Sequence, residues 1–204
     1  MTGRTITTDA AGRCEQSPEK AVVEATAIGE GESAASAQEN ARRCAAAVRE
    51  ALAELDPDRI ATTELEVADS SQAFDPATDE AYRAVERLRI DCAPEAVREV
   101  VVVASDAGAT VPSVEFGLSD ETRTQLEADA LDAAMDRARA KAERIADAEE
   151  LSVGGVQEVT ARGRESGMSS IVDDALASSG DLDVHPGPIP VSESIEVTYE
   201  LADE

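Results

Sequence analysis

Two long segments of the chain carry small apolar residues at helical spacing, and these stripes limit what the chain can fold into. One stripe runs from Ala34 to Leu55 and the other from about Glu121 to Ala148. Steps of three and four residues place side chains on one face of an α-helix. Because many stripe residues are alanine, each predicted helix can approach a sheet closely. The predicted stripes are Ala34, Ala37, Ala41, Cys44, Val48, Leu52 and Leu55 in the first helix, and Leu131, Ala134, Ala138, Ala142 and Ile145 in the second.

Capping and breaking residues mark the ends of both predicted helices. Ser33 precedes the first helix and Ser119-Asp120 precedes the second. Side chains of these types accept hydrogen bonds from the free backbone N–H groups of a first helical turn. Pro57 ends the first helix, because proline cannot continue an α-helix and restricts the residue before it.

A third, shorter helix is predicted over residues 94–107. Its four consecutive valines, residues 100–103, favour a strand by propensity. However, Pro94 stands where a first helical residue would be and Gly108 stands just past the end, which are the positions that proline and glycine prefer in helices. The apolar residues also keep the helical period, so the helix is the preferred interpretation.

Seven segments are predicted to be β-strands, most of them from alternating apolar and polar residues. A short turn at residues 17–20 joins the first two and predicts an antiparallel hairpin. A long polar loop over residues 69–80 joins the third and fourth and predicts a second hairpin. The predicted strands cover residues 4–14, 20–32, 60–68, 82–92, 111–118, 152–161 and the final segment around 195–201.

The order of these elements predicts an α+β fold, in which two long helices and one shorter helix cover antiparallel sheets. Written along the chain, the predicted order is β-β-α-β-β-α-β-α-β-β. We expect an N-terminal α+β subdomain at residues 1–118, followed by the long helix and C-terminal strands at 119–204. An irregular loop is expected over 162–190. One continuous domain is the alternative to this division.

The charge of the chain excludes several classes of protein. There are 44 Asp and Glu against 18 Lys and Arg, a formal net charge of −26. Nucleic acid is not an expected partner, because phosphate binding depends on Lys and Arg that displace counterions. The longest wholly apolar run, Val100–Ala104, is far shorter than the roughly 20 residues of a membrane helix. No signal-peptide pattern opens the chain. We therefore expect a cytoplasmic protein with no membrane span.

The acidic surface indicates a protein adapted to high salt. The cations are 16 arginines and two lysines, Lys20 and Lys141. The Debye length is about 8 Å at physiological ionic strength and about 3 Å at 1 M salt, so repulsion among carboxylates is well screened only in molar salt. We interpret the chain as a cytoplasmic protein of a salt-accumulating halophile, with an acidic protein from a mesophile as the alternative.

The cysteines and the single histidine do not form a pattern typical of a metal or catalytic site. Cys14, Cys44 and Cys92 contain no C-x-x-C pair, and a closed zinc site made from Cys and His would need all three together with His185. We expect the cysteines to be small buried hydrophobes. Nucleophilic catalysis needs a base held near the nucleophile, and His185 lies in a Pro- and Gly-rich segment. No catalytic residue, cofactor or metal ligand is therefore predicted.

Three arginines form the candidate site with the most distinctive pattern. Arg83, Arg87 and Arg89 share the outward face of the predicted strand at 82–92. They could bind an anion, or they could pair across strands with Glu64 and Glu66 of the preceding strand. Cross-strand ion pairing is the preferred interpretation.

Acidic residues of the irregular loop offer a weaker possibility, a cation site. Asp173-Asp174 and Asp181-Leu182-Asp183 cluster carboxylates of the kind that bind hard cations. No EF-hand spacing is present. The pair Gly154-Gly155 is no phosphate loop either, because the Gly-Lys-Ser/Thr end of that motif is missing.

Several local strings, in this order, resemble the SIMPL family of domains of unknown function. The family includes bacterial periplasmic immunogenic proteins and stress-defence proteins. The resemblance spans nearly the whole chain and is specific only in combination. The strings that carry it are Ser36-Ala37-Gln38-Glu39-Asn40, Asp58-Arg59-Ile60-Ala61-Thr62-Thr63, Tyr82-Arg83-Ala84, Val114-Glu115-Phe116-Gly117-Leu118-Ser119-Asp120, Ala138-Arg139-Ala140-Lys141-Ala142, Gly154-Gly155-Val156 and the segment from Pro188-Ile189-Pro190 to Leu201.

The resemblance implies a mixed fold of antiparallel strands and long helices, with ring- or channel-like oligomers in some members and no established catalytic residues. The chain departs from the family pattern because it shows no export signal, which means either a different location or that the soluble part alone is given. On this basis we expect a non-enzymatic, self-associating homo-oligomer with an envelope- or stress-related role. A cation- or small-ligand-binding module is the alternative, and an uncharacterised enzyme is less favoured.

The charge argument predicts salt-dependent stability. The midpoint of thermal unfolding, followed by circular dichroism, should rise as KCl is raised from about 0.1 M to about 2 M, because salt screens the repulsion among carboxylates. A midpoint that is the same at both concentrations contradicts the halophilic interpretation.

Overall fold

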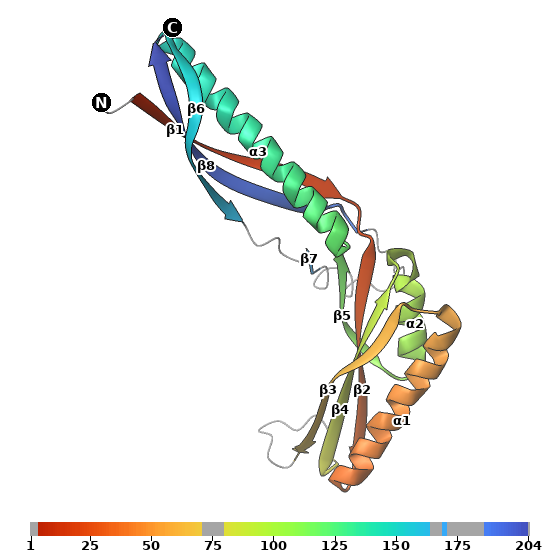
Figure 1. Cartoon of the computed structure of the whole chain (residues 1–204). Coiled ribbons are helices and arrows are strands. Elements are labelled where there is room, and N and C mark those ends of the chain that lie inside the picture. Colours follow the sequence, from red (N-terminus) through yellow and green to blue (C-terminus); the bar gives the residue numbers. More distant parts are fainter. Residues whose placement is uncertain (1–3, 71–79, 164–168, 171–185, 204) are drawn as a thin grey trace. The chain divides into compact units, whose positions relative to one another are not determined.

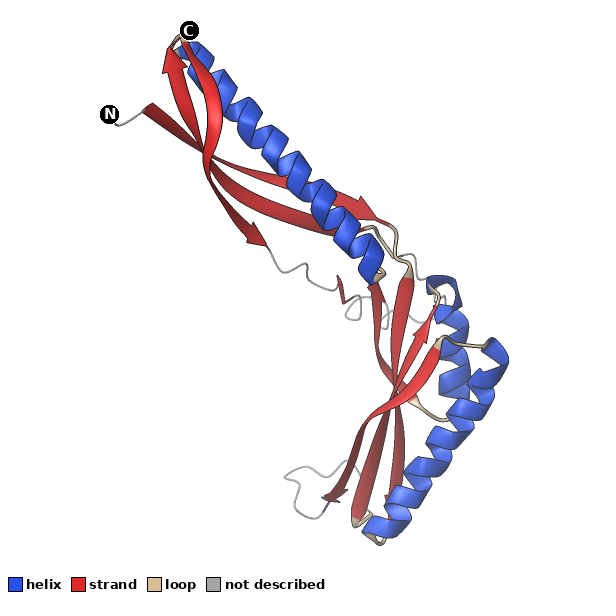
Figure 2. Cartoon of the chain, in the orientation of Figure 1, coloured by secondary structure: helices blue, strands red, loops and turns tan. Residues whose placement is uncertain are grey.

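The computed structural model describes residues 4–70, 80–163, 169–170 and 186–203. These residues form helices and two antiparallel sheets (Figures 1 and 2), which confirms the predicted α+β fold. The chain divides into two compact units, each built around one sheet. The first unit comprises Met1–Ser17, Leu118–Gly167 and Pro188–Glu204, and the second comprises Pro18–Gly117 and Met168–Gly187.

The first unit is a three-stranded sheet with one long helix lying along it (Figure 1). The strand order is β1-β8-β6, and both neighbouring pairs are antiparallel. The elements are β1 (Arg4–Gln16), α3 (Asp120–Ala148), β6 (Leu151–Gly163) and β8 (Ile189–Asp203).

The second unit is a five-stranded sheet of order β3-β4-β2-β5-β7 with the helices α1 and α2. The predicted hairpin over 60–92 is confirmed by the antiparallel pairing of β3 with β4. The elements are β2 (Lys20–Gly31), α1 (Ala34–Leu52), the 3₁₀ turn η1 (Ala53–Leu55), β3 (Arg59–Asp69), β4 (Tyr82–Cys92), the 3₁₀ turn η3 (Pro94–Ala96), α2 (Val97–Asp106), β5 (Thr110–Gly117) and β7 (Ser169–Ser170).

The predicted hairpin of the first two strands is wrong. β1 pairs with β8 along its whole length, from Arg4 opposite Leu201 to Gln16 opposite Ile189. β2 instead lies between β4 and β5 in the other sheet. Alternation sets which face of a strand is buried but does not name its partner. The turn at 17–20 therefore contains the boundary between the units, and β1 belongs with the C-terminal strands.

The helix predicted over 94–107 is confirmed, because η3 and α2 together occupy residues 94–106. Pro94 begins the 3₁₀ turn and Gly108 follows the helix with a φ of +95°, a conformation that glycine adopts without strain. The irregular loop predicted over 162–190 lies largely outside the described residues. Within it, β6 continues to Gly163 and β7 occupies two residues.

Helix α3 buries a line of alanines spaced by four residues. A step of four residues turns about 40° beyond a full helical turn, so the line winds around the helix and follows a twisted sheet. The predicted stripe is corrected at two positions, because Leu131 and Ile145 are 37% and 46% exposed. The buried line is Ala130, Ala134, Ala138, Ala142 and Ala146.

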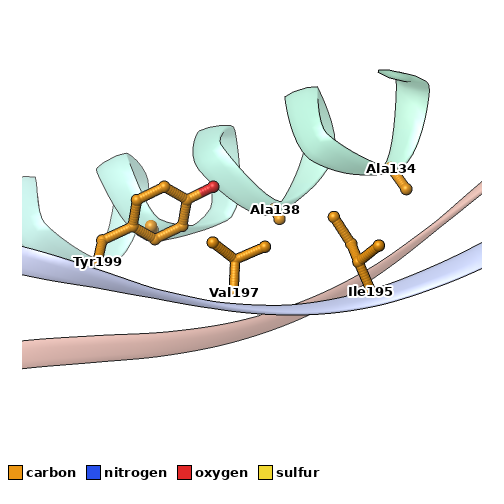
Figure 3. Close-up of a cluster of buried hydrophobic side chains, with 6 residues drawn as sticks. Ala134, Ala138, Ile195, Val197 and Tyr199 are labelled. Atoms are coloured by element: carbon orange, nitrogen blue, oxygen red, sulfur yellow. The ribbon is translucent and has the colours of Figure 1, made fainter. Parts of the chain in front are cut away.

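Below α3 the strands supply the larger side chains of this core. Ile195, Val197 and Tyr199 point from β8 toward Ala134 and Ala138 (Figure 3), and all three are at most 3% exposed. Burial raises the pKa of the Tyr199 hydroxyl, which has no hydrogen-bond partner among the described residues. The core therefore combines a flat alanine surface on the helix with branched and aromatic side chains on the sheet.

Helix α1 likewise covers β2 and β4 with a buried stripe that begins with alanines. Ser33 and Ser36 form a capping box at its start, which confirms the predicted N-cap. Cys44 and Leu55, both predicted stripe members, are only half buried, and Ala34 is exposed. The buried residues of α1 are Ala37, Ala41, Ala45, Val48 and Leu52.

Glycine on the sheet lets each helix approach the backbone. A Cβ at Gly12 of β1 would lie 1.8 Å from the carbonyl oxygen of Ala130 in α3. A Cβ at Gly29 of β2 would lie 2.1 Å from the backbone nitrogen of Ala41 in α1. Both distances are far shorter than van der Waals contact, so any other residue would push the helix away.

We predict that Gly12→Ala lowers the free energy of unfolding by about 1–3 kcal/mol, because the added methyl group overpacks a rigid backbone contact. Gly155→Ala is the matched control, since a Cβ at Gly155 in β6 meets no atom within 4 Å. Denaturant titrations of both variants test the prediction. Equal stability of the two variants contradicts it.

Candidate functional site

A groove of about 330 Å³ lies in the second unit, where α1 passes over the sheet near its β3 edge. Three elements build it, and its lining combines two guanidinium groups, one carboxylate, two uncharged polar groups and one aliphatic side chain. The lining residues are Gln38, Arg42 and Arg49 from α1, Thr62 and Leu65 from β3, and Glu86 from β4.

Helix geometry places the groove residues of α1. Arg42 and Arg49 are seven residues apart, close to two full turns, so both lie on one side of the helix. Gln38 precedes Arg42 by four residues and shares that side. This side borders the buried stripe, which puts the polar ends of the three side chains at the rim of the helix–sheet interface.

A β-bulge places the groove residues of β3. Thr62 and Leu65 are three positions apart, and regular alternation would put them on opposite faces of the sheet. The register of β3 against β4 shifts between Thr62 and Glu64, so that Thr62 lies opposite Leu88 and Leu65 lies opposite Glu86. Both therefore face the helix-covered side, because a bulge inserts one residue and re-aims those after it.

Glu86 is the buried charge of the groove. Its side chain is 10% exposed and its Oε1 accepts hydrogen bonds from Arg49 Nη2 at 2.7 Å and Thr62 Oγ1 at 3.0 Å. Arg49 Nη2 also donates to Thr62 Oγ1 at 2.6 Å. A buried carboxylate needs such partners, since an isolated charge in a low-dielectric site is strongly destabilising. The three groups hold one another in fixed positions.

The remaining cationic groups of the groove have no protein partner in the part of the chain that the structure describes. Both contacts of Arg49 are made by Nη2, so its Nε and Nη1 groups still have N–H donors to offer. Arg42 makes no hydrogen bond or ion pair with the described residues. Two guanidiniums and one carboxylate give the groove a formal charge of +1 in a chain of −26.

Sequence reasoning missed this site, although one signal was present. Tyr82, Ala84, Leu88, Ile90 and Cys92 alternate along the strand at 82–92, and position 86 falls in the same register. A glutamate at an inward position of an alternating strand indicates a buried charge that needs a cation. Which arginine supplies that cation does not follow from spacing alone.

The predicted arginine site lies on the opposite face of β4. Arg87 forms an ion pair with Glu64 of β3, and Arg89 Nε donates to Asp91 Oδ1 at 2.9 Å. Arg83 is half buried, and its Nε has no hydrogen-bond partner among the described residues. The structure thus places all three on one strand face and engages two of them with carboxylates.

The three cysteines differ in burial. Cys92 is buried, and this burial raises the pKa of its thiol to about 11. Cys14 and Cys44 are only half buried, so the expectation of buried cysteines holds for one of the three. Among the described residues, no group of three His, Cys, Asp or Glu is arranged to hold a metal ion. The remaining candidates, His185, Asp173, Asp174, Asp181 and Asp183, lie outside the described residues.

The sequence profile of the SIMPL family, described as a protein of unknown function (DUF541), matches residues 6–199. The chain belongs to the SIMPL family. This confirms the resemblance carried by the local strings. No curated protein matches this SIMPL chain.

Solved structures show only low similarity to the SIMPL chain. AtUAH in complex with glyoxylate has 16% identity and a TM-score of 0.24, and the match covers 60% of this chain and 32% of that chain. The chain thus spans about a third of the length of AtUAH. The regulatory subunit of aspartate kinase from Thermus thermophilus has 11% identity and a TM-score of 0.21, with 92% of this chain and 87% of that chain covered. A hydrolase encoded by lin2189 from Listeria innocua has 13% identity and a TM-score of 0.25, with 95% of this chain and 92% of that chain covered.

In the ranges that the structure describes, no helix of this SIMPL chain is long and apolar enough to cross a bilayer.

We predict that Glu86→Ala lowers the free energy of unfolding by about 1–3 kcal/mol, because it leaves Arg49 and Thr62 without their buried acceptor. Glu66→Ala is the matched control, since Glu66 is an exposed residue of β3. Denaturant titration in molar KCl measures both changes. A Glu86 variant as stable as the Glu66 variant contradicts the assigned role of the buried carboxylate.

Proposed function

We propose that this SIMPL protein is a non-catalytic, self-associating protein with an envelope- or stress-related role, working in the cytoplasm of a salt-accumulating cell. The role and the tendency to assemble follow the family resemblance. The location follows the strongly acidic composition of the chain. The physical support for self-association comes from the end strands of the two sheets.

The observation that carries the proposal is a pair of exposed aliphatic side chains on each of two end strands. On β3, Leu65 and Val67 are 50% and 40% exposed, and on β6, Val156 and Val159 are 47% and 46% exposed. β3 ends the five-stranded order and β6 ends the three-stranded order among the described strands. Unpaired strand edges with apolar residues are templates for pairing with another chain.

The partner that fits best is a second copy of the same chain. Pairing of two end strands satisfies the backbone groups of both edges and covers aliphatic side chains that water otherwise surrounds. Repulsion between two chains of charge −26 opposes this association. Since molar salt shortens the Debye length to about 3 Å, association should strengthen as salt rises.

The experiment is size-exclusion chromatography with light scattering in about 2 M KCl, a concentration at which the Debye length is below about 3 Å. We expect an oligomer that dissociates toward monomer in Val67→Thr or in Val156→Thr/Val159→Thr. Val102→Thr is the matched control, because Val102 is 43% exposed but lies on α2 rather than on an end strand. Only monomer at every salt concentration, or equal dissociation by the control, overturns the proposal.

A further inference from the structure

We infer that the groove between α1 and β3, lined by Arg42, Arg49 and Glu86, binds a small monocarboxylate whose hydrocarbon part lies against Leu65. The inference does not rest on the proposed self-association, although the groove and the β3 edge share Leu65. Four properties of the groove support it: its free donors, their fixed placement, its net charge and its size.

The groove brings together guanidinium donors that no described residue occupies. Arg42 has no ion pair with the described residues, and Arg49 uses only one of its three nitrogens. Guanidinium groups bind carboxylates through parallel N–H donors, and these are the donors left over.

The Glu86–Thr62 contacts fix the position of Arg49. Its Nη2 is held at 2.7 Å from Glu86 Oε1 and 2.6 Å from Thr62 Oγ1. A side chain that is already ordered loses little freedom when it binds an anion, which favours affinity. Arg42 is exposed and lies two helical turns from Arg49 on the same side of α1. Its guanidinium group can therefore close over an anion bound to Arg49.

The charge of the groove selects a single negative charge. Two guanidiniums and the Glu86 carboxylate leave a formal charge of +1, which one carboxylate neutralises. A phosphate dianion would bring a second negative charge near Glu86, whose charge is buried and poorly screened. The groove should therefore favour a monocarboxylate over phosphate.

The size and lining of the groove select a short hydrocarbon tail. About 330 Å³ is at the lower end of the range of small-molecule sites. Leu65 lines the same groove and is half exposed, so it offers an apolar surface that a methylene chain can cover. The expected ligand class is a carboxylate with a few methylene groups.

The test is a titration of the ¹⁵N-labelled chain with potassium hexanoate, at the lowest KCl concentration that preserves its circular dichroism spectrum. We expect saturable shifts of the Arg42 and Arg49 Nε–H signals, with weaker affinity for acetate and phosphate and no saturation by hexanol. Arg42→Gln should weaken hexanoate binding at least fivefold. Arg43→Gln, the matched control, removes the same charge from the next residue of α1, which does not line the groove, and should weaken binding less than twofold.

A second variant tests the charge rule. Glu86→Gln keeps an acceptor for Arg49 and Thr62 and removes the negative charge, so phosphate affinity should rise relative to hexanoate. Equal losses in Arg42→Gln and Arg43→Gln, binding of hexanol as tight as that of hexanoate, or no saturable shift with hexanoate each overturns the inference. Light scattering on the same samples keeps this result separate from the oligomeric state.

Discussion

Direct contact between helix and strand backbones is the constraint on which both units depend. Gly12 lies beneath Ala130 of α3, and Gly29 lies beneath Ala37 and Ala41 of α1. No side chain fits between the two layers at these points, so the helix axis is held close to the sheet. This close approach makes alanine a sufficient core residue, and it explains how a chain with 2% aromatic residues can form two hydrophobic cores.

A thin core also determines where larger and charged groups can lie. In the second unit, α1 leaves the outer part of β3 uncovered, and there Leu65 is half exposed while Glu86 and Arg49 meet at the border. The bulge in β3 turns Thr62 and Leu65 toward the same side. The groove therefore results from one helix covering a wider sheet. Polar and apolar groups lie side by side where the sheet extends beyond α1.

The elements of this fold follow from the sequence much better than their pairing does. Helical spacing and caps predicted both long helices, and Pro94 with Gly108 decided correctly against the strand propensity of the valines. The partner of β1 was missed, because alternation carries no information about which distant strand completes a sheet. The groove was missed for a similar reason: Glu86 was visible as an inward charge, but Arg49 and Thr62 meet it only through tertiary packing.

The pairing of β1 with β8 has a consequence for biosynthesis. Arg4 lies opposite Leu201, so β1 must wait until β8 has been made before its sheet can close. The sheet neighbours β2, β3, β4 and β5 all lie within Pro18–Gly117, so they are complete well before β8 is made. Domains generally fold as units during synthesis, and long sequence separation slows closure. The second unit should thus begin to fold during synthesis earlier than the first unit, whose sheet needs both β1 and β8.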